Sequence, residues 1–174
     1  SMINKMPGLG EDKFSNLKAG YTFMLGHPGK KLLFMGQDFG QWHEWDEKVS
    51  LDWYLTKEPF HADLQNYVKG LLTLYHKYPA LYRLDEEYDG FQWINANDGD
   101  RSIFSFIRRD ETGKKNLLFV INFTPMARDD YRVGVPKSGT YTLILDNEHG
   151  LYKRGEHAFS KRSVKSECDG QPYS

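Results

Sequence analysis

The chain has 174 residues, and its 23 Lys and Arg are balanced by 24 Asp and Glu, for a formal net charge of -1. The length suits about one domain, and the charge balance excludes the clustered basic surface of a typical nucleic-acid-binding or polybasic membrane-surface protein. The apolar runs are too short for a membrane-spanning helix, no signal-peptide pattern is recognisable, and the single cysteine, Cys168, predicts a reducing, cytoplasmic location.

The N-terminal half reads as helices around one short strand. Residues 1–11 have no clean period and contain Pro7 and two glycines, which predicts a loop. Apolar residues recur at the spacing of one helix face over residues 14–25, and the His-Pro-Gly that follows ends that helix. The apolar run at residues 32–35 lies between Gly29 and Gly36, which predicts a strand over residues 31–35 that is buried on both faces in a parallel sheet.

The rest of the chain is predicted to contain one more helix, followed by a series of short β-strands. A second helix is predicted over residues 61–78, stopped by Pro79, and a linker follows over residues 80–90. Short β-like runs separated by Gly, Asp and Pro turns then predict an antiparallel β-sandwich. The organisation is therefore α/β plus all-β, with an α/β part at residues 1–86 and an all-β part at residues 87–174. The β-like runs are residues 91–95, 102–109, 116–124, 131–135 and 140–145, and no structure is predicted for residues 146–174.

The first candidate for a binding site directly follows the predicted strand. The carboxyl end of a parallel strand is where open sheets and (β/α)8 barrels bind ligands. Gln37, Asp38 and Gln41 supply hydrogen-bond donors and acceptors there that suit sugar hydroxyls. The alternative is a glycine turn in which Asp38 caps a following helical turn.

The second candidate is the loop that continues from it. Indole faces beside carboxylates can hold a sugar ring, because the ring stacks on the indole while the acids accept its hydroxyls. The alternative for each tryptophan is structural, as a plug over the end of a barrel core. The residues concerned are Trp42, Trp45, Asp52 and Trp53.

The sequence gives little indication of metal binding, phosphate binding or nucleophilic catalysis. Asp38, His43, Glu44 and Asp46 could be read as metal ligands, but their spacing matches no common metal motif, so no metal and no cofactor is expected. The sequence has no phosphate-binding glycine loop, no GxSxG and no CxxC. The acidic pairs at residues 86–87 and 129–130 are typical of solvated turns.

Several longer motifs resemble one family. They are KMPG at residues 5–8, HPGKKLLFMG at 27–36, FGQ at 39–41, SLDW at 50–53, YPALY at 78–82, DGFQWI at 89–94, INFTP at 121–125 and YRVGVP at 131–136. Together they resemble the bacterial glycogen (1,4-alpha-glucan) branching enzymes of the alpha-amylase-like glycoside hydrolase superfamily. The resemblance extends through GQPYS at the end of the chain.

The resemblance implies a position within that family's fold. Residues 1–78 correspond to the C-terminal end of a catalytic (β/α)8 barrel, with its last two helices and its eighth strand. The β-like runs correspond to the family's C-terminal β-sandwich, and both ends of the chain look truncated. One barrel strand without its neighbours leaves backbone groups unpaired. The expected partner of residues 32–35 is the remainder of the barrel, or a second copy of the chain if it is expressed alone.

The resemblance also implies the activity of the longer enzyme. The family cleaves an alpha-1,4 glucan and transfers the segment to a 6-hydroxyl by a retaining mechanism with two carboxylates and a supporting Asp. None of these can be matched here; they are expected before Ser1, so the chain alone is expected to be inactive. The implied contribution is a glucan-binding loop made of Gln37, Asp38, Gln41, Trp42, Trp45, Asp52 and Trp53.

One departure and two alternatives accompany this interpretation. The family commonly has Glu where this sequence has Asp38, which draws the carboxylate back by one methylene. One alternative is a non-catalytic glucan-binding or assembly module. The other is part of a related alpha-amylase-type hydrolase, although KMPG and SLDW favour a branching enzyme.

Overall fold

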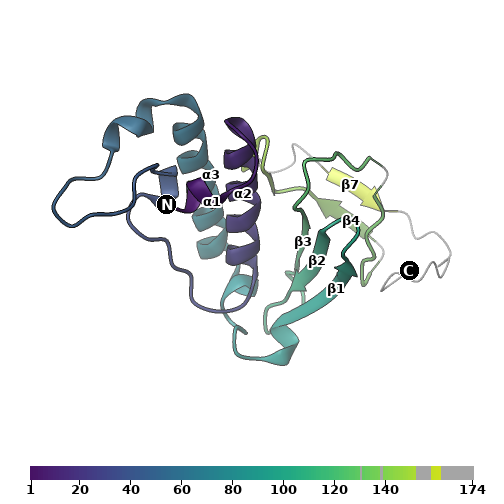
Figure 1. Ribbon diagram of the computed structural model, residues 1–174. Helices are drawn as coiled ribbons and strands as arrows, with labels where there is room; N and C mark the ends of the chain where they lie inside the picture. The colour runs from purple at the N-terminus through teal and green to yellow at the C-terminus, as the bar shows by residue number, and fades with distance from the viewer. Residues whose placement is uncertain (130, 138, 152–157, 162–174) are drawn as a thin grey trace.

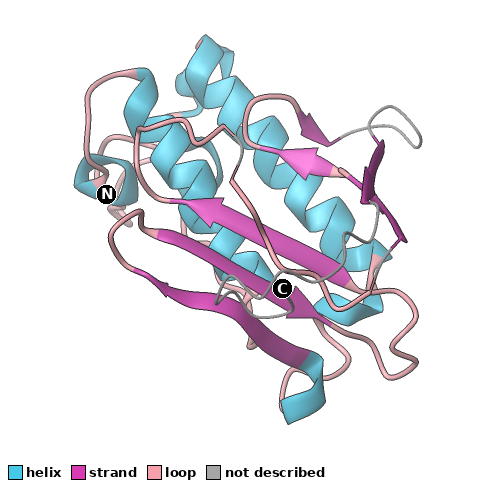
Figure 2. Cartoon of the chain, turned by 90° about the vertical axis from the view of Figure 1, so that its right-hand side faces the viewer, coloured by secondary structure: helices cyan, strands magenta, loops and turns pink. Residues whose placement is uncertain are grey.

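The computed structural model describes residues 1–129, 131–137, 139–151 and 158–161. The helices of the N-terminal half lie on one side and the strands of the C-terminal half on the other (Figure 1). Figure 2 shows the strands in front of the two long helices. Among the described residues, no helix is both long and apolar enough to cross a bilayer.

Both predicted long helices are confirmed. Helix α2 carries Glu11 and Asp12 in its first turn, where carboxylates complement the helix dipole, and it ends at the His-Pro-Gly sequence. Helix α3 starts with a proline in its first turn and ends two residues before Pro79. The prediction of a loop over residues 1–11 is wrong in part, because a one-turn helix forms there. The α-helices are α1 (Met2–Lys5), α2 (Glu11–Gly26) and α3 (Pro59–Lys77).

Helices α2 and α3 pack against each other through their apolar faces. The buried side chains are spaced three or four residues apart, so they lie on one face of each helix. Ile3 of α1 is fully buried at the end of this core. The cluster consists of Ile3, Phe14, Leu17, Tyr21, Leu25, Leu64, Tyr67, Val68 and Leu71. Within the described residues, the 3₁₀ turns are η1 (Gln37–Phe39), η2 (Trp53–Lys57), η3 (Pro79–Leu81) and η4 (Tyr88–Gly90).

The β half is antiparallel, as predicted. Its main sheet has the order β1-β2-β3, and two smaller ladders pair β4 with β7 and β5 with β6. The run at residues 140–145 is divided between β4 and β5, and residues 131–135 form no strand, which corrects that prediction. The strands are β1 (Phe91–Asp98), β2 (Ile103–Arg108), β3 (Leu117–Asn122), β4 (Gly139–Thr142), β5 (Leu145–Asp146), β6 (Gly150–Leu151) and β7 (Ala158–Lys161). Cys168 and the GQPYS motif lie outside the described residues.

The predicted strand at residues 31–35 is not a strand. A strand needs a neighbour for its backbone hydrogen bonds, and no described strand pairs with this segment. Its side chains are correspondingly uncovered: Leu32 is 74% exposed and Met35 50% exposed. The prediction that the run is buried on both faces is therefore wrong for the structure of this chain.

The helical and β halves share a packed interface. The Phe23 ring on α2 contacts Phe104, Phe106 and Phe123 of the β half at centroid distances of 6.4, 5.9 and 5.9 Å. Gly26, the last residue of α2, lies so close to the sheet that a Cβ there would be 2.6 Å from the Phe119 ring. The halves therefore form one packed unit and not two separate lobes.

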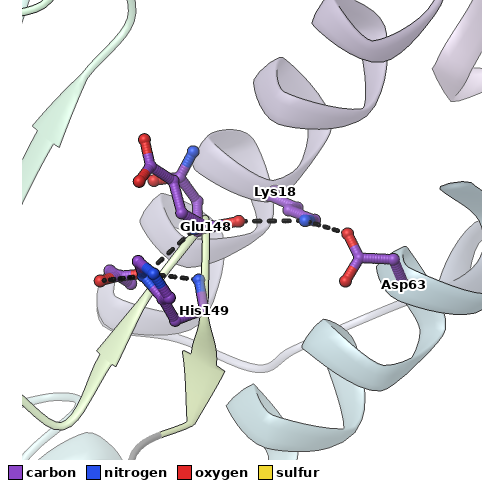
Figure 3. A network of polar contacts seen from close by, with 6 residues as sticks. Lys18, Asp63, Glu148 and His149 are labelled. Carbon is purple, nitrogen blue, oxygen red and sulfur yellow. Dashed lines mark hydrogen bonds and ion pairs between the residues drawn. The ribbon is translucent and has the colours of Figure 1, made fainter.

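The buried side chains of Arg108 and Lys18 form hydrogen bonds and ion pairs across this interface. Arg108 on β2 is fully buried and donates to the Gly26 carbonyl, the Gly90 carbonyl and the Asp85 carboxylate. Lys18 on α2 lies between Asp63 of α3 and the turn that joins β5 to β6, where it donates to the carbonyl of Asn147 (Figure 3). Each cation joins segments that are far apart in the sequence.

Candidate functional site

The candidate binding loop begins with a tight glycine turn. Gly36 and Gly40 have left-handed backbones, with φ of 77° and 67°, and they enclose η1. A Cβ at Gly36 would lie 2.9 Å from the Gln41 side chain, so both the conformation and the space favour glycine. The turn is also held from α2, since the Tyr21 hydroxyl donates to the Gln37 carbonyl over 2.8 Å. Burial, and then the charge of Asp38, raise the pKa of that Tyr21 hydroxyl above its usual range.

Gln41 closes the loop from the inside. Its side chain is 6% exposed. Its Oε1 accepts from the backbone N–H of Asp52 at 2.8 Å, and its Nε2 donates to the His43 carbonyl at 3.2 Å. Because its polar atoms are used within the loop, Gln41 shapes the loop and is poorly placed to contact a ligand.

Trp42 lies on the core side of the loop. Its ring meets Phe14 and His61 edge-on, at centroid distances of 5.9 and 5.5 Å, and it packs against the helical core. Its carbonyl accepts a hydrogen bond from Asn4 at 2.8 Å. These contacts correspond to the structural alternative for this tryptophan.

Gln37 and Asp38 also have partners within the chain. The Oε1 of Gln37 accepts from the backbone N–H of Phe34 at 2.9 Å. The Asp38 carboxylate accepts from Gln65 of α3 at 3.0 Å, so it holds the turn to that helix. Both side chains remain partly accessible.

Trp45 and Trp53 present their rings outward. Trp45 is 41% exposed and meets Phe34 edge-on at 5.2 Å, whereas Trp53 is 56% exposed and lies against the buried Phe39 at 5.5 Å. Each ring thus has one supported side and one accessible side. This is the arrangement that a stacking platform for a sugar needs.

Asp52 pairs with a histidine that the sequence interpretation did not assign to the site. Nδ1 of His43 lies 2.7 Å from Oδ2 of Asp52. The His43 side chain is 76% exposed, and the Asp52 side chain 21% exposed. Nothing in the sequence signals this contact except the nine-residue separation across the loop, because it depends on how Gln41 closes the loop.

A small cavity lies beside these residues. It has a volume of about 170 Å³ and is lined by residues 1–3, 34–37, 40, 41 and 43–45. In the part of the chain that the structure describes, no three His, Cys, Asp or Glu side chains come together as a metal site would require. The lining combines the Trp45 ring with hydrogen-bonding groups and the Glu44 carboxylate, which suits a polyhydroxylated ligand.

Comparison with known proteins adds the family context. Residues 93–174 match the family model described as the alpha amylase C-terminal all-beta domain. Over its whole length, the chain is 53% identical to the 1,4-alpha-glucan branching enzyme GlgB of Butyrivibrio fibrisolvens, of which it covers 28%. The chain is a sequence relative of the bacterial 1,4-alpha-glucan branching enzymes.

Two more branching enzymes show the same pattern. The protein of that name from Aquifex aeolicus is 48% identical over 87% of this chain, and the one from Gloeobacter violaceus is 45% identical over all of it. The chain covers 24% of each of these two proteins. It therefore spans only about a quarter of the length of the branching enzymes that it matches.

Proposed function

We propose that this chain is the portion of a 1,4-alpha-glucan branching enzyme that supplies part of the glucan-binding groove. The enzyme would cleave an alpha-1,4 glucan and transfer the segment to a 6-hydroxyl. The observation that carries this proposal is the sequence identity of 53%, over the entire chain, to a protein with that name. Because the chain matches only about a quarter of such a protein, we assign the catalytic carboxylates to the remaining part.

We propose that the glucan lies on the outward face of the loop. Trp45 and Trp53 would stack on sugar rings, since both rings are accessible on one side. Gln41 and Trp42 would act by holding the loop, as their contacts are internal. Gln37 and Asp38 would contact sugar hydroxyls only after giving up or sharing their present partners.

Binding of maltoheptaose measured by isothermal titration calorimetry tests the loop. Trp53→Ala should raise Kd by at least about tenfold, because a stacked aromatic anchor carries much of the affinity of such a site. Tyr88→Ala is the matched control, since Tyr88 is 99% exposed and lies outside the loop. Equal affinities of the wild-type chain, Trp53→Ala and Trp45→Ala would refute the binding role of the loop.

The division into two structural parts belongs to the same proposal. Residues 1–86 would be the end of a (β/α)8 barrel, and residues 87–174 a β-sandwich domain. The support is the uncovered segment at residues 31–35, part of which lines a cavity of about 600 Å³ together with residues of α3. The remainder of the barrel would cover it with neighbouring strands.

Sedimentation velocity tests the role of that segment. The chain alone should self-associate through the exposed apolar side chains of this segment, and Leu32→Lys should shift it to monomer, because burying an unpaired charge between two copies is unfavourable. A wild-type chain that remains monomeric at high concentration with a cooperative melt would contradict this. An assay for loss of the amylose–iodine colour should find no activity in the isolated chain.

A further inference from the structure

Three residues of the loop form a closed ring of hydrogen bonds. Gln41 accepts from the backbone of Asp52 and donates to the backbone of His43, and the side chains of His43 and Asp52 then meet over 2.7 Å. Gln41 is buried, so it anchors both ends of the ring to the core. The relative position of His43 and Asp52 is therefore fixed by the fold, although the imidazole itself is exposed.

This ring determines what the imidazole offers to a ligand. An ionised carboxylate only accepts hydrogen bonds, so its partner Nδ1 is the donor. In the neutral ring, Nε2 then carries the lone pair and is an acceptor. With 76% of the His43 side chain exposed, this second nitrogen is left for a hydroxyl from outside.

The surroundings of His43 match a sugar unit. His43 and Trp45 line the same cavity of about 170 Å³. That volume is below the roughly 300–1,000 Å³ of sites for drug-sized ligands, and it suits one ring of a longer chain. Trp45 offers an apolar face, and His43 and Glu44 offer polar groups, which suits a sugar ring with hydroxyls at its rim.

We propose that Nε2 of His43 binds a hydroxyl group of an α-1,4-glucan, and that Asp52 is a positioning residue that acts through His43. This inference rests on the proposed function of the loop and assigns its hydrogen-bonding group. It gives Asp52 an indirect role, in contrast to direct contact with the sugar. It predicts that the effects of replacing His43 and of replacing Asp52 on the Kd for glucan are not additive.

A double-mutant cycle on the full chain with maltoheptaose tests this assignment. His43→Gln should raise Kd about three- to tenfold, which is the size of one hydrogen bond. Asp52→Asn should raise Kd in the wild-type background and cause no further rise in the His43→Gln background, because its effect passes through the imidazole. His149→Gln is the matched control: His149 forms a similar pair with Asp146 at 3.2 Å, in the β5–β6 turn, and its loss should leave Kd unchanged.

A spectroscopic readout keeps the test independent of stability. In long-range ¹H–¹⁵N spectra, the Nε2 signal of His43 should move on addition of maltoheptaose while the folded pattern of the chain persists. An unchanged Kd for His43→Gln together with weakened binding by Trp45→Ala would overturn the inference and leave the proposed function standing. Additive effects of His43→Gln and Asp52→Asn would overturn the positioning role of Asp52. If none of these variants changes Kd, the proposed function fails as well.

Discussion

Replacing Arg108 by Met should be among the most destabilising single changes in this chain. The guanidinium donates from Nη1 to the Gly26 carbonyl at 2.6 Å and from Nε to the Gly90 carbonyl at 3.1 Å. Its Nη2 donates to Asp85 at 2.5 Å. Methionine fills similar space but has none of these donors, so the Gly26 carbonyl and the Asp85 carboxylate lose this partner. The Gly90 carbonyl still accepts from the backbone N–H of Arg109.

The magnitude follows from the burial of both members of the pair. The Arg108 side chain is fully buried, and that of Asp85 is 16% exposed. Removing one member of a buried ion pair costs about 3–5 kcal/mol. Since water still reaches part of Asp85, we expect the lower end, about 3 kcal/mol. For a protein of this size, that corresponds to a fall in Tm of roughly 6–12 °C.

Urea unfolding followed by fluorescence and circular dichroism measures this loss of free energy. Arg109→Met is the matched control, because the neighbouring Arg109 donates to Gln92 at 2.6 Å on the exposed side of the sheet. That control should cost less than about 1 kcal/mol. If Arg108→Met is no more destabilising than Arg109→Met, the reasoning that Arg108 joins the two halves is refuted.

Two further predictions concern α2 and the core. In urea unfolding, Gly26→Ala should lower stability by about 1–3 kcal/mol, since its Cβ would lie 2.6 Å from the Phe119 ring. Gly20→Ala should raise stability by about 0.5–1 kcal/mol, since nothing lies within 4 Å of the added atom. A Gly26→Ala variant that is more stable than Gly20→Ala would contradict the close packing of Gly26 on the sheet. Burial raises the pKa of Tyr67 to about 12. Tyrosine in an unfolded chain ionises near pH 10. The buried neutral Tyr67 hydroxyl therefore contributes fully to the free energy of unfolding below about pH 10, and this contribution is lost as the pH rises toward 12. Tyr67→Phe should flatten that alkaline decline, Tyr88→Phe should not, and parallel pH profiles for wild type and Tyr67→Phe would disprove the assignment.

The elements that the sequence predicted correctly are those with local causes. Helices α2 and α3 have their apolar period and their first turns within their own residues, and each ends two residues before a proline. Strands β1, β2 and β3 pair with sequence neighbours across turns rich in Gly and Asp. The strand expected at residues 31–35 failed because its stability depends on neighbours that the described structure does not contain.

The sequence predicts the loop, but it does not predict which side chains of the loop face outward. Trp42 and Trp45 are three residues apart in one loop, yet Trp42 packs on Phe14 and His61, whereas Trp45 is 41% exposed. Composition identified the loop as rich in indoles but could not decide which of them faces outward. The pair of His43 and Asp52 was missed for a related reason, since it forms only when the loop closes on Gln41.

The indole N–H signals of the four tryptophans test the central claim most directly. Trp42, Trp45, Trp53 and Trp93 each contribute one signal to a ¹H–¹⁵N spectrum, and maltoheptaose can be titrated into the unmodified chain. If the loop binds glucan through its outward face, the signals of Trp45 and Trp53 should shift and saturate together. If both signals stay fixed at saturating maltoheptaose, the loop is not a glucan-binding surface.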